Sequence, residues 1–196
     1  WVACTAWLLR AGVPGWPLIP APVRIVLGVL ALWLAWLAVV QARILGINFL
    51  LSVLTLVWVA DIFAYFAGRA FGLRFTRNKL APSISPGKSW EGVWGGLAGV
   101  LCLAVAWVAA DRYFQADVAS FYTRLYSAGW WFLAIAVVFM VAMSVAGDLV
   151  ESLIKRSAGV KDSSGLLPGH GGVLDRVDAL LPTLPLALML TRLISV

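Results

Sequence analysis

Long apolar stretches are the feature that most limits what this chain can fold into. A helix needs about 20 mainly apolar residues to cross a bilayer, with a range of about 17–25. Four stretches of the 196-residue chain meet that requirement, and a fifth is shorter and interrupted by two prolines. The predicted spans are Ile25–Val40 with an extension back past Arg24 to Val23, Ile44–Ala60 with a continuation through Ile62–Ala67, Val93–Ala110, Trp130–Gly147 and a kinked terminal helix over Ala179–Thr191.

The composition supports a membrane location. Hydrophobic residues make up 62% of the chain and charged residues 12%, whereas soluble domains are about 25% charged. We therefore expect an all-α fold, a polytopic integral membrane bundle of about five to six transmembrane helices, forming one membrane-embedded domain over residues 1–196. Cys4 and Cys102 lie among apolar residues with no Cys-x-x-Cys motif, so neither a disulfide nor a zinc site is expected.

The N-terminal region does not have the pattern of a complete span. Trp1–Leu9 is expected to be the end of a helix whose start is missing, so we expect further N-terminal spans to be absent from this chain. Ala11–Pro22 contains four prolines and is expected to form a loop.

Lysine and arginine are unevenly shared among the connections between the spans. Gly68–Gly92 holds five, Asp111–Gly129 two and Asp148–Asp178 four. Because cytoplasmic loops collect Lys and Arg, the two basic connections are predicted to lie on the cytoplasmic side, in what we expect to be a bacterial inner membrane. The net charge of +6 then requires no nucleic-acid partner. Asp111 and Asp117, in the sparse connection, are expected to be solvated.

Acidic residues are concentrated where the fourth span enters a basic connection. An ionised side chain costs about 2.5–3.5 kcal/mol at the centre of a membrane helix, so acids near hydrocarbon indicate a function. If the helix continues past Gly147, five polar residues share one face. Such a face can bind a metal and a polyphosphate, and the alternative is a ladder of surface ion pairs. The five are Asp148, Glu151, Ser152, Lys155 and Arg156.

A glycine-rich loop with the single histidine follows this face. Its glycines would let backbone N–H groups approach an anion closely. Asp175 and Asp178 come next and would share a face at the start of the last helix. The alternative is that these two acids stabilise the positive end of the helix dipole. The loop residues are Gly165, Pro168, Gly169, His170, Gly171 and Gly172.

The first basic connection offers a matching polar set. One helix face at the end of the second span carries Asp61, Tyr65, Gly68 and Arg69. Lysine and serine side chains at a membrane surface suit lipid or nucleotide phosphates. The alternative is a basic loop without a ligand, which we favour for Arg74 and Arg77. The candidates in the loop are Lys79, Ser83, Ser85, Lys88 and Glu91.

Two blocks of the chain together resemble a known family. The phosphatidate cytidylyltransferases, or CDP-diacylglycerol synthases, carry a signature similar to Ser152-x-x-Lys155-Arg156-x4-Lys161-Asp162-x5-Pro168-Gly169-His170-Gly171-Gly172-x-x-Asp175-Arg176-x-Asp178. The stretch Asp61–Gly92 resembles the family's other shared block, with Ser89 where Thr is expected. The resemblance extends over nearly the whole chain from Ile25 onward, and the missing N-terminal spans are its main departure.

The resemblance implies that CTP and phosphatidate react to give CDP-diacylglycerol and pyrophosphate with the help of Mg²⁺, in one or two copies. Hard oxygen ligands without a Cys or His cluster suit Mg²⁺ rather than zinc. The expected partners are CTP, phosphatidate, membrane lipids and a second copy of the chain in a homodimer. The expected metal ligands are Asp148, Asp175 and Asp178, with Glu151 as a further candidate.

The remaining polar residues receive substrate roles. The cations Lys155, Arg156, Lys161 and Arg176 are expected to hold the triphosphate or the leaving pyrophosphate. The phosphatidate head group, or the rest of the nucleotide, is assigned to Arg69, Lys79, Ser85 and Lys88. His170 is expected to donate a hydrogen bond rather than act as a base, because a phosphate monoester with a second pKa near 6 is already largely ionised at pH 7.

Two complete sets summarise these expectations. The candidate catalytic residues are Asp148, Lys155, Arg156, Lys161, Asp162, His170, Asp175, Arg176 and Asp178. The candidate substrate-binding residues are Asp61, Tyr65, Arg69, Lys79, Ser83, Ser85, Lys88, Glu91, Ser152, Gly169, Gly171 and Gly172.

Two other functions stay open at this point. A CTP-dependent polyprenol kinase would transfer the γ-phosphoryl group and release CDP instead of pyrophosphate. A transporter or channel would place its acids nearer the middle of the spans. A CDP-alcohol phosphatidyltransferase is disfavoured, because the Asp-Gly-x-x-Ala-Arg run of that class is missing.

Overall fold

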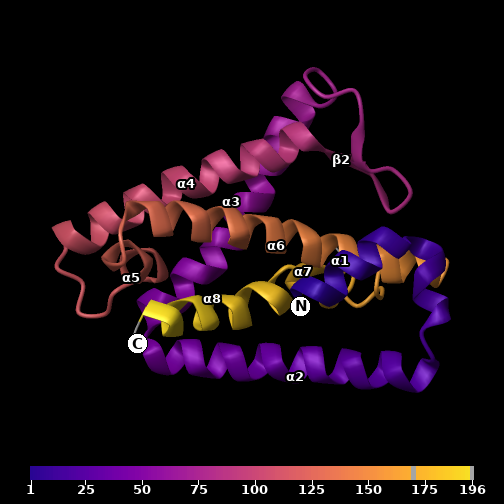
Figure 1. Cartoon of the computed structure of the whole chain (residues 1–196), viewed down its shortest axis with the longest axis horizontal. Helices are drawn as coiled ribbons and strands as arrows, with labels where there is room; N and C mark the ends of the chain where they lie inside the picture. Colours follow the sequence, from indigo (N-terminus) through magenta and orange to yellow (C-terminus); the bar gives the residue numbers. More distant parts are fainter. Residues whose placement is uncertain (169–170, 195–196) are drawn as a thin grey trace.

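The computed structural model of the chain describes residues 1–168 and 171–194. Helices dominate this part of the chain, and two short strands form a hairpin (Figure 1). The elements are α1 (Val2–Ala11), the 3-10 helix η1 (Val13–Leu18), α2 (Ala21–Leu45), α3 (Ile47–Phe71), β1 (Lys79–Ala81), β2 (Ser85–Ser89), α4 (Trp90–Tyr113), α5 (Phe121–Ser127), α6 (Trp130–Ser157), α7 (Leu174–Val177) and α8 (Leu180–Ile194).

Five helical segments in the described residues are long and apolar enough to cross a membrane. They are α2, α3, α4, α6 and the stretch Leu174–Ile194 that contains α7 and α8. This confirms the predicted polytopic helical bundle. The helices continue beyond the apolar stretches, so that α3 runs past Asp61 to Phe71 and α6 runs past Asp148 to Ser157.

Two local predictions differ from the structure. The stretch after Lys79 forms an antiparallel hairpin in which Lys79 pairs with Ser89. The sequence pattern did not predict this hairpin because Pro86 and Gly87 occupy β2, and both residues are uncommon inside strands. The expected loop over Ala11–Pro22 contains η1 and the first two residues of α2, where proline is tolerated because no backbone N–H bond is required there.

The bundle has two distinct ends. Figure 1 shows α2 and α8 side by side below α6, while α3 and α4 diverge from α6 toward the hairpin. One end carries α5, and the opposite end carries the hairpin and the loop between α6 and α7; we call them the α5 end and the hairpin end. Both basic connections lie at the hairpin end, in agreement with the prediction that they share a side.

Glycines on α4 allow this helix to pack very closely against α3. A Cβ atom placed on Gly96 would lie 2.8 Å from the Ala60 carbonyl oxygen, and one on Gly92 would lie 3.0 Å from the Ala64 carbonyl oxygen. Small residues at a spacing of four let membrane helices approach to backbone contact. The pair α3–α4 therefore behaves as one unit that carries the hairpin at its end.

A buried polar network holds the α5 end together. The side chain of Asp111 is buried, and its carboxylate accepts hydrogen bonds from Asn48 Nδ2 at 2.9 Å, from the Ser120 backbone N–H at 3.0 Å and from Thr123 Oγ1 at 2.6 Å. The indole of Trp107 donates to Asn48 Oδ1 at 2.9 Å. The prediction that Asp111 is solvated is therefore wrong, because α4 extends to Tyr113 and the segment leading into α5 folds over the carboxylate.

We predict that Asp111→Ala lowers the stability of the folded protein. The substitution leaves the buried Ser120 backbone N–H and the half-buried Thr123 hydroxyl without this acceptor, and each unsatisfied group costs roughly 1–3 kcal/mol. Thermal unfolding in detergent, followed by intrinsic fluorescence, should show a clear decrease in Tm. Asp117→Ala is the matched control, since Asp117 is exposed, and its Tm should equal that of the parent. Equal Tm values for both variants would contradict a stabilising role of the network.

Candidate active site

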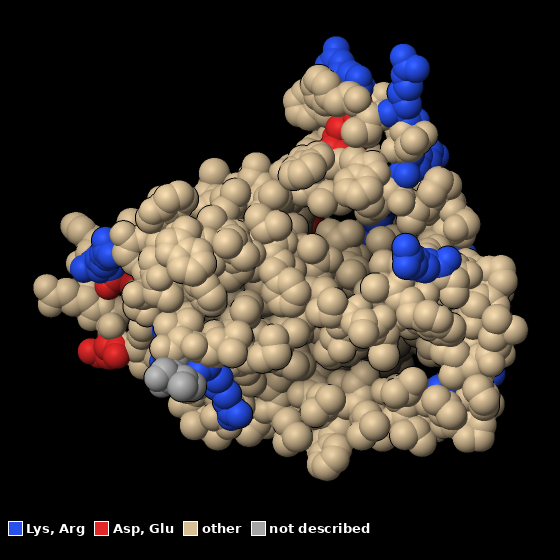
Figure 2. All heavy atoms as spheres, in the orientation of Figure 1, with Lys and Arg blue, Asp and Glu red and all other residues tan. Residues whose placement is uncertain are grey.

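A pocket of about 430 Å³ lies between α3, α4, α6 and the hairpin. Its walls are mostly apolar, with Ala60 and Ala64 on α3 and Val141 and Val145 on α6. Charged groups enter the same pocket near the hairpin end. Figure 2 shows a hollow beneath the protruding hairpin with acidic and basic side chains in its wall. The charged and polar lining residues are Asp61, Tyr65, Arg69, Lys88, Ser89 and Asp148.

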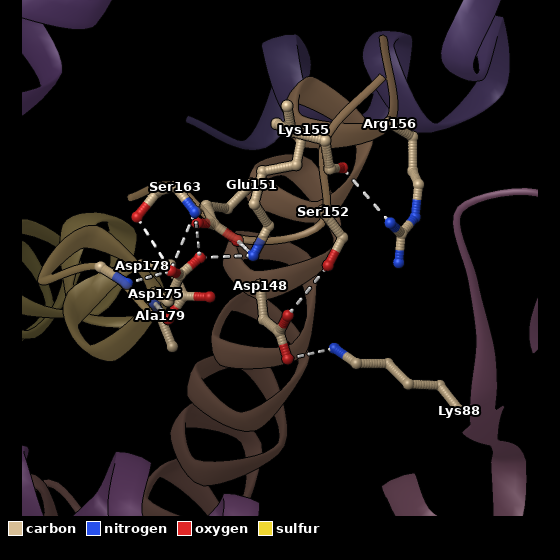
Figure 3. Close-up of polar contacts among 12 residues, drawn as sticks. Lys88, Asp148, Glu151, Ser152, Lys155, Arg156, Ser163, Asp175, Asp178 and Ala179 are labelled. Atoms are coloured by element: carbon tan, nitrogen blue, oxygen red, sulfur yellow. Dashed lines mark hydrogen bonds and ion pairs between the residues drawn. The ribbon is translucent and has the colours of Figure 1, made fainter. Parts of the chain in front are cut away.

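An ion pair joins the hairpin to α6 across this pocket. Lys88 Nζ, on β2, contacts Asp148 Oδ2, and Ser152 Oγ donates to Asp148 Oδ1 at 3.3 Å (Figure 3). Asp61 and Asp178 both interact electrostatically with Asp148 and with Lys88. Three carboxylates therefore share the field of one lysine, which leaves an excess of negative charge in this part of the site.

The approach of Asp178 to α6 depends on a glycine that precedes Asp148. A Cβ atom on Gly147 would lie 2.8 Å from Pro182 Cγ and 3.1 Å from the Asp178 carbonyl oxygen. Only a residue without a side chain lets the start of the last span lie this close to α6. Gly147 thus brings Asp148 and Asp178, which are 30 positions apart in sequence, into one electrostatic cluster.

A second cluster surrounds Lys155, one to two turns farther along α6. Lys155 Nζ contacts Glu151 Oε2 within the helix and Asp175 Oδ1 at 2.6 Å across to α7. Glu151 is buried and Lys155 is largely so. The ion pair of Glu151 with Lys155 is of the kind that the alternative interpretation expected, but it is not part of a surface ladder because Glu151 is buried and Asp175 is the third member (Figure 3).

Asp175 also organises the loop before α7. Its carboxylate accepts hydrogen bonds from the Ser163 backbone N–H at 3.0 Å, from Ser163 Oγ at 2.9 Å and from the Gly172 backbone N–H at 2.7 Å. The loop folds back on itself, with Leu167 donating to the Gly171 carbonyl at 2.9 Å. Asp175 therefore ties the predicted phosphate-binding loop to Lys155 and α6.

Other predicted residues have local partners. Arg69 Nη1 donates to Tyr65 Oη at 3.1 Å at the pocket wall, and Arg156 Nη1 donates to the Val160 carbonyl at 3.3 Å at the end of α6. Glu91 is buried and accepts from Thr76 N at 2.7 Å and Thr76 Oγ1 at 2.8 Å. Glu91 therefore anchors the connection between α3 and β1.

The structure does not bring every candidate into the pocket. Six exposed candidates do not line it: Lys79, Ser83, Arg156, Lys161, Asp162 and Arg176. Ser85 lies half-buried on β2, outside the pocket lining. Gly169 and His170 lie outside the described residues.

Sequence reasoning missed Ser163, which binds Asp175, and Gly147. It also gave no role to Gly92 and Gly96, which line the pocket. The four-residue spacing of these glycines was the available signal.

The donor chemistry of the first cluster fits a divalent cation. Asp61, Asp148 and Asp178 offer hard oxygen atoms, and their combined negative charge exceeds the single positive charge of Lys88 among them. In the part of the chain that the structure describes, no three acidic, histidine or cysteine side chains already form a set that could hold a metal ion. Asp148 faces Lys88, and the predicted ligands Asp175 and Glu151 face Lys155.

Comparison with known proteins places the sequence of this chain in a family. The model of the cytidylyltransferase family matches residues 5–194. The chain belongs to the cytidylyltransferase family. It is 51% identical over 140 residues to the phosphatidate cytidylyltransferase of Haemophilus influenzae. The matched region makes up 71% of this chain and 44% of the relative.

Other family members give a similar result. The phosphatidate cytidylyltransferase of Pseudomonas aeruginosa is 46% identical over 164 residues, 83% of this chain and 55% of the relative. That of Thermotoga maritima is 40% identical over 146 residues, 74% of this chain and 49% of the relative. The chain thus spans about half the length of these curated cytidylyltransferases.

We predict that Gly172→Ala loosens the loop tied by Asp175. A Cβ atom on Gly172 would lie 2.8 Å from the Ser164 backbone nitrogen and closer still to Ser163 Oγ, so the two serines must move away. Hydrogen exchange at the Ser163 amide should become faster. Gly165→Ala is the matched control, because a Cβ atom there meets nothing within 4 Å. Unchanged exchange in Gly172→Ala would show that the Asp175 contacts do not fix this loop.

Proposed function

We propose that this chain transfers a cytidylyl group from CTP to phosphatidate, giving CDP-diacylglycerol and pyrophosphate. One observation carries the proposal: an apolar pocket between membrane-spanning helices ends in a cluster of acidic and basic side chains. Curated relatives over this region are named phosphatidate cytidylyltransferase. Phosphatidate, which joins acyl chains to a phosphate, needs such a boundary between hydrocarbon and charge, and the nucleotide triphosphate needs the cationic groups there.

The two parts of the pocket match the two parts of phosphatidate. Its acyl chains suit the apolar surface of Ala60, Val141 and Val145. Its phosphate suits Lys88 and Arg69, because charge-assisted hydrogen bonds to phosphate are among the stronger polar contacts. The nucleotide phosphates would bind nearer Lys155 and the glycine-rich loop before α7, because glycines let backbone N–H groups approach an anion closely.

The reaction asks little covalent chemistry of the protein. A phosphate oxygen of phosphatidate attacks the α-phosphorus of CTP, and the bond from that phosphorus to the oxygen bridging to the β-phosphate breaks as pyrophosphate leaves. The attacking oxygen is already ionised near pH 7, so no side chain has to remove a proton. The protein has to position two polyanions and offset their repulsion, which Lys88, Arg69 and Lys155 would do.

A divalent cation would be held by Asp148 and Asp178, with Asp61 beside them. When bound, it supplies charge neutralisation at the phosphates. Asp175 and Glu151, also predicted as ligands, would then act through Lys155. This division explains why the site contains two acidic clusters rather than one.

The proposal includes a location. The pocket lies at the hairpin end, and both lysine- and arginine-rich connections lie there too. We propose that this end faces the cytoplasm, where CTP is available, and that the protein resides in a bacterial inner membrane.

A product assay tests the reaction. The purified protein in detergent is incubated with phosphatidate and CTP, and pyrophosphate and the lipid product are both measured. Equal amounts of pyrophosphate and CDP-diacylglycerol are expected. Release of CDP with a polyprenol acceptor would instead support a CTP-dependent polyprenol kinase, and absence of both products would reject the proposal.

We predict that Lys88→Ala reduces turnover roughly 10- to 100-fold. A hydrogen bond to a charged group contributes about 1.5–3 kcal/mol, and about 1.4 kcal/mol corresponds to a factor of ten. Initial rates at saturating CTP measure the effect. Arg77→Ala is the matched control, because Arg77 is an exposed cation of the same basic connection outside the pocket. Lys88→Ala activity within about twofold of the parent would leave the loop with a topological role alone.

We predict that Asp148→Asn and Asp178→Asn each reduce activity by about 100-fold or more, since even outer-shell partners of a metal are worth roughly 10- to 100-fold. Chelation of divalent cations should abolish activity of the parent, and Mg²⁺ should restore it. Both variants should melt at or above the Tm of the parent, because each removes a charge from a repelling cluster. Asp117→Asn should be unaffected. Full activity of Asp178→Asn with unchanged Mg²⁺ dependence would contradict the proposed metal site.

A further inference from the structure

A second hollow lies at the α5 end of the bundle, away from the candidate active site. Its volume is about 400 Å³, within the range of about 300–1,000 Å³ typical of small-molecule sites. The second half of α4 and the start of α6 line it, together with Tyr126 of α5. Its apolar surface includes Leu101, Ala104, Val108, Leu133 and Ala134.

One charged residue belongs to this lining. The guanidinium carbon of Arg112 lies 4.7 Å from the centre of the Tyr126 ring, a cation–π distance. Within residues 1–168 and 171–194, no carboxylate lies within ion-pair distance of Arg112. The adjacent residue, Asp111, does not pair with Arg112: the Asp111 carboxylate accepts hydrogen bonds from Asn48, Ser120 and Thr123. The hollow therefore pairs an apolar surface with a cation that forms no ion pair within the described residues.

The length of the hollow matches one leaflet of a bilayer. Leu101 and Arg112 are 11 residues apart on α4, which corresponds to about 16 Å at a rise of about 1.5 Å per residue. Half of a hydrocarbon core about 30 Å thick is about 15 Å. Trp130 is 74% exposed at the same end, as is typical of an aromatic residue at a membrane interface. Arg112 would then lie at the level of the lipid phosphates.

We propose that this hollow, called the groove from here on, binds one phospholipid with an anionic head group. The lipid comes from the leaflet at the α5 end. One acyl chain lies along the groove between α4 and α6, and its phosphate contacts Arg112. The site is separate from the pocket at the hairpin end, so the inference does not depend on the proposed reaction. The positive charge of Arg112, which forms no ion pair with a described carboxylate, favours an anionic lipid over a zwitterionic one.

Native mass spectrometry of the detergent-solubilised protein tests this site. With phosphatidylglycerol, the parent should retain one more lipid than Arg112→Gln, and the difference should vanish with phosphatidylcholine. Arg43→Gln is the matched control: Arg43 is an exposed arginine at the same end, on α2, outside the groove. Arg43→Gln should retain as many lipids as the parent. Equal retention by Arg112→Gln and the parent would overturn the proposal.

A second variant fills the groove without removing the cation. Ala109 is exposed and lines the groove, so Ala109→Trp should lose the same lipid while keeping the parental Tm. Loss in both variants supports the site. If Ala109→Trp instead keeps its lipid and changes the mass of the assembly from dimer to monomer, the groove is an interface with a second copy and the lipid site is rejected.

Discussion

Close packing of α4 on α3 is the constraint on which the rest of the structure depends. Gly92 and Gly96 place backbone against backbone, so that the two helices leave the bundle as one rigid pair and diverge from α6 toward the hairpin. The divergence creates the pocket, and the hairpin at the end of the pair carries Lys88 back to Asp148. A side chain larger than hydrogen at Gly96 would push Ala60 away and change the pocket wall directly.

Two lysines, Lys88 and Lys155, organise the acidic side chains at the hairpin end. Lys155 lies between Glu151 and Asp175 and forms an ion pair with each of them. Lys88 faces Asp148 but shares the field of two further carboxylates, Asp61 and Asp178. Because charges near hydrocarbon are costly unless paired, the larger excess of carboxylates around Lys88 suits a metal ion, and the ion pairs of Lys155 hold this lysine near the loop where the nucleotide phosphates would bind.

Much of this arrangement follows from local sequence pattern. The apolar stretches predicted the spans, and the spacing of Asp148, Glu151 and Lys155 predicted one helix face, because period and length are local properties. The hairpin was not predictable, since Pro86 and Gly87 hide its pairing. The burial of Asp111 was not predicted either, because it depends on hydrogen-bond donors up to 63 positions away in the sequence. Tertiary contacts of this kind carry no signal in a window of neighbouring residues.

The central claim is that substrates bind in the pocket between α3–α4 and α6, and cysteine protection tests it most directly. With Cys4 and Cys102 replaced by serine, Val145→Cys places a thiol in the pocket wall and Val160→Cys places one on the exposed loop after α6. Phosphatidate and CTP together should slow maleimide labelling of Val145→Cys and leave Val160→Cys unchanged. Equal labelling rates of Val145→Cys with and without saturating substrates, in a catalytically active protein, would contradict the account.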